Sequence, residues 1–119
     1  MNRSLLDAQE DRIDAFERAR VEDPEVALNE FLPPSDDDDY AIVAVELMRI
    51  DLESCWRQGT PKRLAEYQNN FANVLKDREL LSELAFEEYR CRLQSGSDVK
   101  PEEYVERFAI SIDHWPLTE

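Results

Sequence analysis

Two stretches of the chain, 37 residues apart, decide its fold because they align without a gap. The first, residues 46–73, reads ELMRIDLESCWRQGTPKRLAEYQNNFAN, and the second, residues 83–110, reads ELAFEEYRCRLQSGSDVKPEEYVERFAI. Seven of the 28 aligned pairs are identical, whereas typical residue frequencies would give about two. The alignment therefore predicts an internal repeat. The identical pairs are Glu46/Glu83, Leu47/Leu84, Gly59/Gly96, Glu66/Glu103, Tyr67/Tyr104, Phe71/Phe108 and Ala72/Ala109.

Each copy begins with the pattern of a long helix. In the first copy the helix should run from near Asp39 to Arg57 or Gln58, because a polar stripe faces a wide apolar arc over this range. In the second copy it should run from about Arg78 to Gln94. The polar stripe of the first helix consists of Glu46, Arg49, Glu53 and Arg57, whose spacing also pairs opposite charges.

Each long helix is followed by a break and a short helix. Gly59 and Gly96 are the only glycines in the chain, and each should stop a long helix. Thr60 should cap a short helix over residues 61–72, and Pro101 should open the second short helix. Since hairpin turns usually require more glycine, the sequence predicts an all-α fold of about five helices in long–short pairs.

The remaining segments fit a single domain spanning residues 1–119. We expect a flexible N-terminus at residues 1–11, a degenerate half copy of the repeat at 12–32 and an acidic linker at 33–39. With a slip of one residue, the half copy has its break and its aromatic residue near the corresponding positions of the full copies, at Pro24, Leu28 and Phe31.

The chain is strongly acidic: 28 acidic and 14 basic side chains give a formal net charge of −14. Nucleic acid and anionic membrane surfaces should repel such a domain, because both are bound mainly through Lys and Arg. We expect a basic protein surface as the partner, while the same charge also serves solubility alone. Asp36, Asp37, Asp38 and Asp39 are interpreted first as a solvated linker and second as an acidic recognition segment. Ser35 beside them is a candidate for phosphorylation.

The N-terminus has no apolar run of the signal-peptide kind, and no stretch approaches the length of a membrane span. We therefore expect a cytoplasmic protein in which Cys55 and Cys91 are free thiols.

The sequence predicts no catalytic, cofactor or metal site. Two glycines so far apart exclude a phosphate-binding loop. His114 has no neighbour suited to general-base catalysis, and we interpret it as a surface or packing residue. Two isolated cysteines and one distant histidine lack the spacing of a zinc site, and the run Asp36–Asp39 lacks the glycine turn of a calcium loop.

Two acids occupy apolar positions of the predicted long helices. On a helical wheel Asp51 falls opposite the polar stripe, and Glu88 falls in the matching place of the second copy. We expect a buried structural pair of carboxylates, each held by a salt bridge to Arg63, Arg92 or Arg107, since an unpaired buried carboxylate is costly. Removing the Asp51 carboxylate should then cost about 1–3 kcal/mol. An acid/base pair is the alternative, although nothing nearby would bind a substrate.

Aromatic residues recur at helical spacing in both copies. Core packing is their default role, and any that remain exposed would be interaction hot spots. The candidates for partner contact are Trp56, Tyr67 and Tyr104.

Three strings resemble a known family. They are I-D-L-E-x-x-W-R-x-G-x-x-x-x-L-x-E-Y (residues 50–67), E-E-Y-R-x-R-x-x-x-G (87–96) and P-E-E-Y-x-x-R-F (101–108). Together they resemble the N-terminal helical regions of planctomycete serine/threonine protein kinases, over roughly residues 12 to 110. The chain carries no Gly-rich loop, no His-Arg-Asp catalytic loop and no Asp-Phe-Gly, so no catalytic residue is implied.

The resemblance implies a non-catalytic interaction or regulatory module of a bacterial serine/threonine kinase, either part of a longer kinase chain or free-standing. Its partner would be the kinase domain of the same chain or a regulator of that domain. Two alternatives stay open: a free-standing acidic adaptor of the same fold, and an acidic mimic of nucleic acid. The mimic would need uninterrupted carboxylates along one face, whereas Lys and Arg interrupt most acidic stretches here.

Overall fold

The structure is a computed structural model that describes residues 5–113 and residue 115, with side chains from residue 10 onward. This part of the chain is all-α and contains no strand. Its elements, in chain order, are α1 (Leu5–Glu22), the 3-10 helix η1 (Leu28–Phe31), α2 (Tyr40–Arg57), α3 (Leu64–Asn70), α4 (Ala72–Leu75), α5 (Arg78–Gln94) and α6 (Glu102–Phe108).

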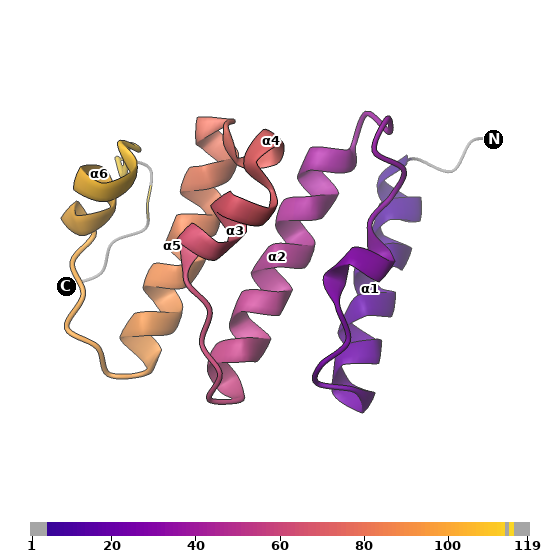
Figure 1. Cartoon of the computed structure of the whole chain (residues 1–119), viewed down its shortest axis with the longest axis horizontal. Helices are drawn as coiled ribbons and strands as arrows, with labels where there is room; N and C mark the ends of the chain where they lie inside the picture. The colour runs from indigo at the N-terminus through magenta and orange to yellow at the C-terminus, as the bar shows by residue number, and fades with distance from the viewer. Residues whose placement is uncertain (1–4, 114, 116–119) are drawn as a thin grey trace.

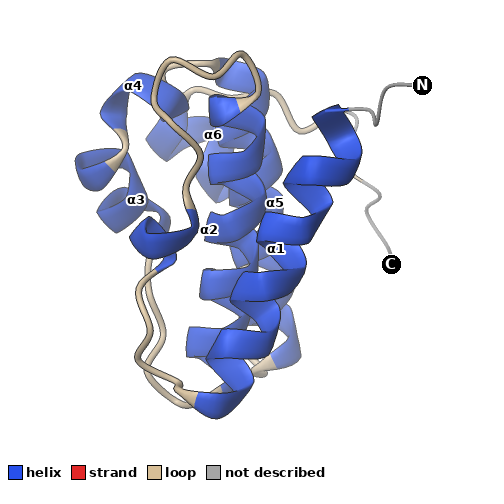
Figure 2. Cartoon of the chain, turned by 90° about the vertical axis from the view of Figure 1, so that its right-hand side faces the viewer, coloured by secondary structure: helices blue, strands red, loops and turns tan. Residues whose placement is uncertain are grey.

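The three long helices form one layer. α1, α2 and α5 lie side by side with α2 in the middle, and they run in the same direction (Figure 1). η1, α3 and α4 lie over one face of this layer (Figure 2), and α6 lies beside α5 at its edge (Figure 1). The short elements and their loops therefore return the chain from the end of one long helix to the start of the next.

One hydrophobic core joins the two layers, and α2 lies at its centre. Val43, Leu47, Met48 and Leu52 of α2 are almost completely buried, between α1 on one side and α5 on the other. The wide apolar arc expected for this helix therefore contacts neighbours on several sides, as a central helix must.

The predicted bounds of α2 and α5 are confirmed, because glycine ends both helices. Gly59 and Gly96 take left-handed conformations, with φ of 83° and 89°. The amides of the following residues, Thr60 and Ser97, each donate back to a carbonyl five residues earlier, at 2.9 Å. This is the Schellman arrangement, in which a residue without a Cβ satisfies the last carbonyls of a helix.

The first short helix differs from the prediction. It begins at Leu64 with Arg63 as N-cap, not at Thr60, because the chain first runs extended past Lys62. It also breaks at Phe71, whose φ of −131° and ψ of 47° are not helical, so that α3 and α4 replace one continuous helix. Asparagines, which are poor helix formers, precede and follow this break. The described chain consequently has six α-helices where about five were expected.

The N-terminal segment also differs from the prediction. α1 already includes residues 5–11, which we expected to be flexible. Leu, Ala, Gln, Glu and Arg are frequent in α1 and neither glycine nor proline interrupts it, so helix is favoured from Leu5 onward. The chain breaks near Pro24, as the half-copy alignment predicts, and continues as the 3-10 helix η1.

The C-terminal segment folds back onto α5 and α6. Trp115 is buried among Phe86, Tyr89 and Tyr104, and its indole N–H donates to the hydroxyl of Ser82 at 3.0 Å. The neighbouring His114, interpreted above as a surface or packing residue, lies outside the described residues.

Candidate functional site

Asp51 and Glu88, the two acids expected in the interior, are 2% and 3% exposed. Each is the centre of a polar cluster within the apolar core. The Asp51 cluster consists of Asp51, Arg20, Ser54, Cys55, Lys62 and Tyr67. The Glu88 cluster consists of Glu88, the backbone amide of Leu64, Tyr104 and Arg92.

Both oxygens of Asp51 receive strong donors. The Tyr67 hydroxyl donates to Oδ2 at 2.6 Å, and Lys62 Nζ pairs with the same oxygen at 2.9 Å. Arg20 Nη2 forms an ion pair with Oδ1. A hollow of about 430 Å³ between η1 and α3 reaches this cluster, but the carboxylate is already satisfied by donors of the chain itself.

Arg20 is the residue that the sequence analysis missed. It lies in the last turn of α1, 8% exposed, and also donates to the carbonyl of Val26 at 2.7 Å and to the Ser54 hydroxyl at 3.3 Å. Its Nε is buried without a hydrogen-bond partner among the described residues. Arg20 thereby joins α1 and the following loop to α2, and the arginines expected in this role (Arg63, Arg92, Arg107) do not contact Asp51.

Glu88 is held without a cation. The Leu64 amide donates to Oε2 and the Tyr104 hydroxyl to Oε1, both at 2.6 Å. No described Lys or Arg forms an ion pair with it; Arg92, one of the expected partners, instead donates to the Tyr104 oxygen at 3.3 Å. Glu88 therefore fixes the start of α3 and the middle of α6 against α5 through neutral donors.

Corresponding contacts recur at positions 37 apart in the two stretches quoted first. The Tyr67–Asp51 and Tyr104–Glu88 hydrogen bonds are both 2.6 Å long. At the start of each short helix, a backbone amide donates to the glutamate three residues later in the chain. Arg63 N donates to Glu66 at 2.8 Å, and Lys100 N donates to Glu103 at 3.0 Å. The contact at α3 belongs to a capping box, and the contact at α6 holds the amide of the residue before its N-cap, Pro101.

The clusters keep their phenols protonated. Burial, followed by the adjacent carboxylate, raises the pKa of both Tyr67 and Tyr104 well above the ordinary value. Each tyrosine therefore remains a hydrogen-bond donor at any physiological pH, so neither serves as a base. With 3% and 2% exposure their rings are also not surface contacts, contrary to the partner-contact role considered above.

The Asp51 carboxylate keeps its charge. Burial acts to raise its pKa, but the hydrogen bonds from Tyr67, Lys62 and Arg20 outweigh burial and hold the pKa below the ordinary value. Its charge is therefore part of the folded structure.

Acid should remove the stability that Asp51 supplies. Because its pKa is lower in the folded state, the unfolded chain takes up this proton first as the pH falls. The stabilisation is then complete above about pH 4, the ordinary range of an aspartate, and is lost progressively below it. Urea unfolding should show a difference between wild type and Asp51→Asn that is largest near pH 6 and shrinks toward pH 3. Glu53→Gln, at an exposed pair with Arg57, is the control, with a small difference throughout. A constant Asp51→Asn difference across this range would contradict the assignment.

The two cysteines are free and buried, so they offer no exposed nucleophile. Burial, followed by the charge of Asp51, raises the pKa of Cys55. Burial, followed by the charge of Glu87, raises the pKa of Cys91 to about 11. Both are therefore neutral thiols at neutral pH.

Trp56 is half-buried and holds the loop before α3. Its indole N–H donates to the carbonyl of Lys62 at 3.1 Å, and the Arg63 guanidinium lies 5.5 Å from the ring centroid. Trp56 is therefore the one candidate for partner contact among the three whose ring is partly exposed.

The polar stripe of α2 links that helix to α5. Arg49 pairs with Glu46 at 2.7 Å and with Glu87 of α5 at 3.5 Å, and Arg90 also pairs with Glu87 at 3.1 Å. These groups line a groove of about 520 Å³ on the layer of long helices. Because opposite charges alternate there, the groove has no net preference for an anion or a cation.

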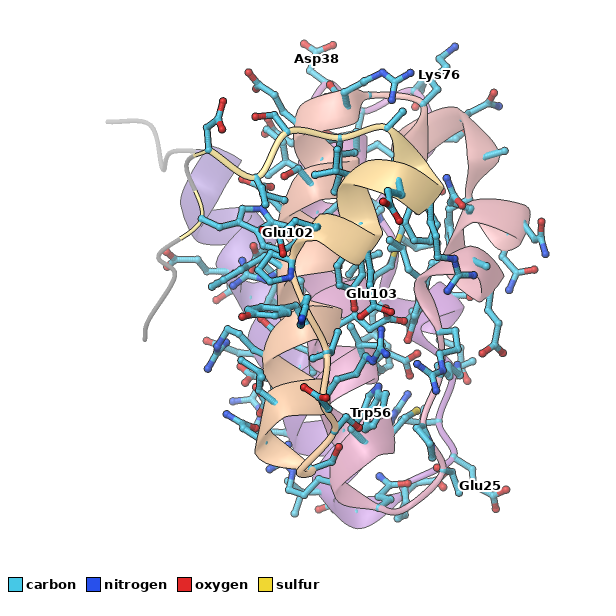
Figure 3. The ribbon with its side chains drawn as sticks, turned by 90° about the vertical axis from the view of Figure 1, so that its left-hand side faces the viewer. Glu25, Asp38, Trp56, Lys76, Glu102 and Glu103 are labelled. Atoms are coloured by element: carbon cyan, nitrogen blue, oxygen red, sulfur yellow. The ribbon has the colours of Figure 1, made fainter. Side chains whose placement is uncertain are left out.

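The acidic run lies at the end of the molecule where α2 begins. Asp37 accepts from the amide of Asp39 at 2.8 Å, which shapes the turn before the helix. Asp36 and Asp38 are exposed, and Asp38 points into solvent (Figure 3). Two of the four acids are thus free for long-range attraction, while Asp37 and Asp39 also organise the turn.

Comparison with known proteins gives no match: no family model, no curated protein and no solved structure is similar to this chain. Within the described residues, no group of three or more His, Cys, Asp or Glu side chains is arranged to hold a metal ion. No helix in this part of the chain is both long enough and apolar enough to cross a membrane.

Proposed function

We propose that this chain is a non-catalytic protein-interaction module whose partner presents a basic surface. The observation that carries the proposal is how the acids are used. The carboxylates of Asp51 and Glu88 are held by donors of the chain and stabilise the fold, whereas the chain as a whole has a net charge of −14 that acts on its surroundings. A domain of this charge attracts basic proteins and repels nucleic acid.

The resemblance to the N-terminal regions of planctomycete kinases narrows this proposal. It favours a regulatory module of a bacterial serine/threonine kinase in the cytoplasm, with the catalytic domain or a regulator of it as the partner. An internal repeat of 37 residues is part of the same proposal. It is supported by the matched tyrosine–carboxylate bonds, capping contacts and glycine helix ends.

Binding to the catalytic domain of a serine/threonine kinase from the same organism should be driven by charge. The association rate should fall at least about ten-fold as the Debye length decreases from about 10 Å at 0.1 M salt to about 3 Å at 1 M. Stopped-flow fluorescence would measure this rate. Asp36→Asn/Asp38→Asn should lower it more than it raises the dissociation rate, because exposed charges mainly steer encounter.

The control is Glu22→Gln/Glu25→Gln, which removes two exposed charges from the other end of the molecule. Figure 3 shows Glu25 and Asp38 at opposite ends. Equal effects of the two variants on the association rate would mean that the acidic run contributes no more to binding than other exposed charges do. Absence of binding at every salt concentration, to the catalytic domain and to any other basic protein tested, would overturn the proposed function. Displacement by DNA of a bound DNA-binding protein would favour the mimic instead.

A further inference from the structure

A groove of about 600 Å³ lies beside the acidic run, between the start of α2 and the α3–α4 junction. We call it the Tyr40–Phe71 groove after two half-buried aromatic residues that line it. Both side chains are partly buried and pack against the hydrophobic core. The volume lies within the range of about 300–1,000 Å³ usual for binding pockets.

The charge at this groove has one sign. Asp37 and Asp38 line it, and no Lys or Arg is among its lining residues. Lys76 is at the same end of the molecule (Figure 3) but is not among the residues that line the groove. A cation is therefore favoured over an anion here, in contrast to the balanced charges of the groove between the long helices.

The groove also has unused hydrogen-bonding groups. Among the described residues, the structure gives no hydrogen bond to the Tyr40 hydroxyl or to the side chains of Asn70 and Asn73, all of which border it. The helix break at Phe71 places these amides at the rim, because α3 stops at Asn70 and Val74 N donates to the carbonyl of Phe71 at 3.1 Å. Side-chain amides both donate and accept, as a peptide backbone requires.

We propose that the Tyr40–Phe71 groove binds an extended basic segment of the partner protein, with one arginine side chain lying along the two rings. Its guanidinium faces Asp37 and Asp38, and the backbone on either side pairs with Asn70 and Asn73. Arginine fits best because its planar group stacks on aromatic faces and pairs with carboxylates, whereas lysine provides only a point charge. The proposal rests on the proposed function and names the surface and the chemistry that it uses.

The probe is a nine-residue, end-blocked peptide that carries three arginines, and its control replaces each arginine by citrulline, which has the same shape without the charge. Titrated into the ¹⁵N-labelled full chain, the arginine peptide should shift amide resonances mainly in residues 35–41 and 69–74. The citrulline peptide should shift them at least ten-fold less at equal concentration. Shifts spread evenly over all acidic helix faces would show that the peptide does not bind in the groove, and would leave the proposed function standing.

Two pairs of variants distinguish binding in the groove from attraction to the overall negative charge. Asp38→Asn should weaken the peptide about three-fold, the effect of one exposed ion pair. Asp36→Asn removes the same charge next to the groove but not in it, and should change binding less than half as much. Asn73→Arg places a cation in the groove and should abolish the localised shifts, whereas Asn29→Arg, at an exposed site on η1, should not. If the Asn73→Arg variant binds the kinase catalytic domain as well as wild type does, the groove is not the binding surface, and the proposed function still stands.

Discussion

Asp51→Ala should lower the free energy of unfolding by about 3–5 kcal/mol, the cost of leaving a buried charge without its partner. The expectation from the sequence, about 1–3 kcal/mol, counted only the lost hydrogen bond of a carboxylate. The structure raises it because Arg20 is 8% exposed and relies on Asp51 as its counter-charge. A domain of this size is usually stable by about 5–15 kcal/mol, so much of its stability depends on this side chain.

Urea unfolding at neutral pH, followed by circular dichroism, measures the change. Glu53→Ala is the matched control on the same helix, because its carboxylate forms an exposed pair with Arg57; it should cost at most about 0.5 kcal/mol. Arg20→Met/Asp51→Ala should recover part of the loss, since it removes the stranded guanidinium. If the two losses of stability simply add, the double variant will be less stable than Asp51→Ala by the full cost of Arg20→Met alone. That result would show that the two residues are not coupled.

Tyr104→Phe should cost more than Tyr67→Phe, although the two hydroxyls make bonds of equal length. Without the Tyr104 hydroxyl, Glu88 keeps one of its two described donors, the amide of Leu64. Without the Tyr67 hydroxyl, Asp51 still has Arg20 and Lys62. We therefore expect about 2–3 kcal/mol for Tyr104→Phe and about 1–1.5 kcal/mol for Tyr67→Phe, on the scale of hydrogen bonds to charged groups.

The same unfolding measurements test this order. Tyr40→Phe is the control, because the structure gives the Tyr40 hydroxyl no hydrogen bond among the described residues, and its stability should match that of wild type. A larger loss for Tyr67→Phe would mean that Lys62 and Arg20 do not compensate for the missing hydroxyl.

The long helices could be predicted closely from the sequence, whereas the short elements could not. Gly59 and Gly96 fix the ends of α2 and α5 by a backbone conformation that few other residues adopt, so the bounds are local information. The break at Phe71 depends on how α3 and α4 each pack against α5. Such tertiary contacts override the weak propensities of a short helix.

The candidate site was also predictable only in part. Helical periodicity places Asp51 and Glu88 in the interior because it uses only the spacing along one helix. It cannot choose the donor: Arg20 comes from α1, 31 residues away in sequence, and its approach depends on how that helix docks. The aromatic walls of the Tyr40–Phe71 groove were hidden for a similar reason, since Tyr40 and Phe71 come together only when α4 folds against α2.

The shared direction of α1, α2 and α5 gives this layer a net dipole along the helix axes (Figure 1). Each helix carries a macrodipole with its positive end at the N-terminus, and three parallel macrodipoles add instead of cancelling. Asp39 and Asp77 stand at the positive ends of α2 and α5, and Arg20, Arg57 and Arg92 occupy the last turns of α1, α2 and α5 at the negative ends. The acidic run is thus partly compensated by the positive end of α2, where Asp39 is the N-cap. A base in place of Asp39 or Asp77, or an acid in place of Arg57 or Arg92, would put the wrong charge at the end of a helix and should oppose its macrodipole.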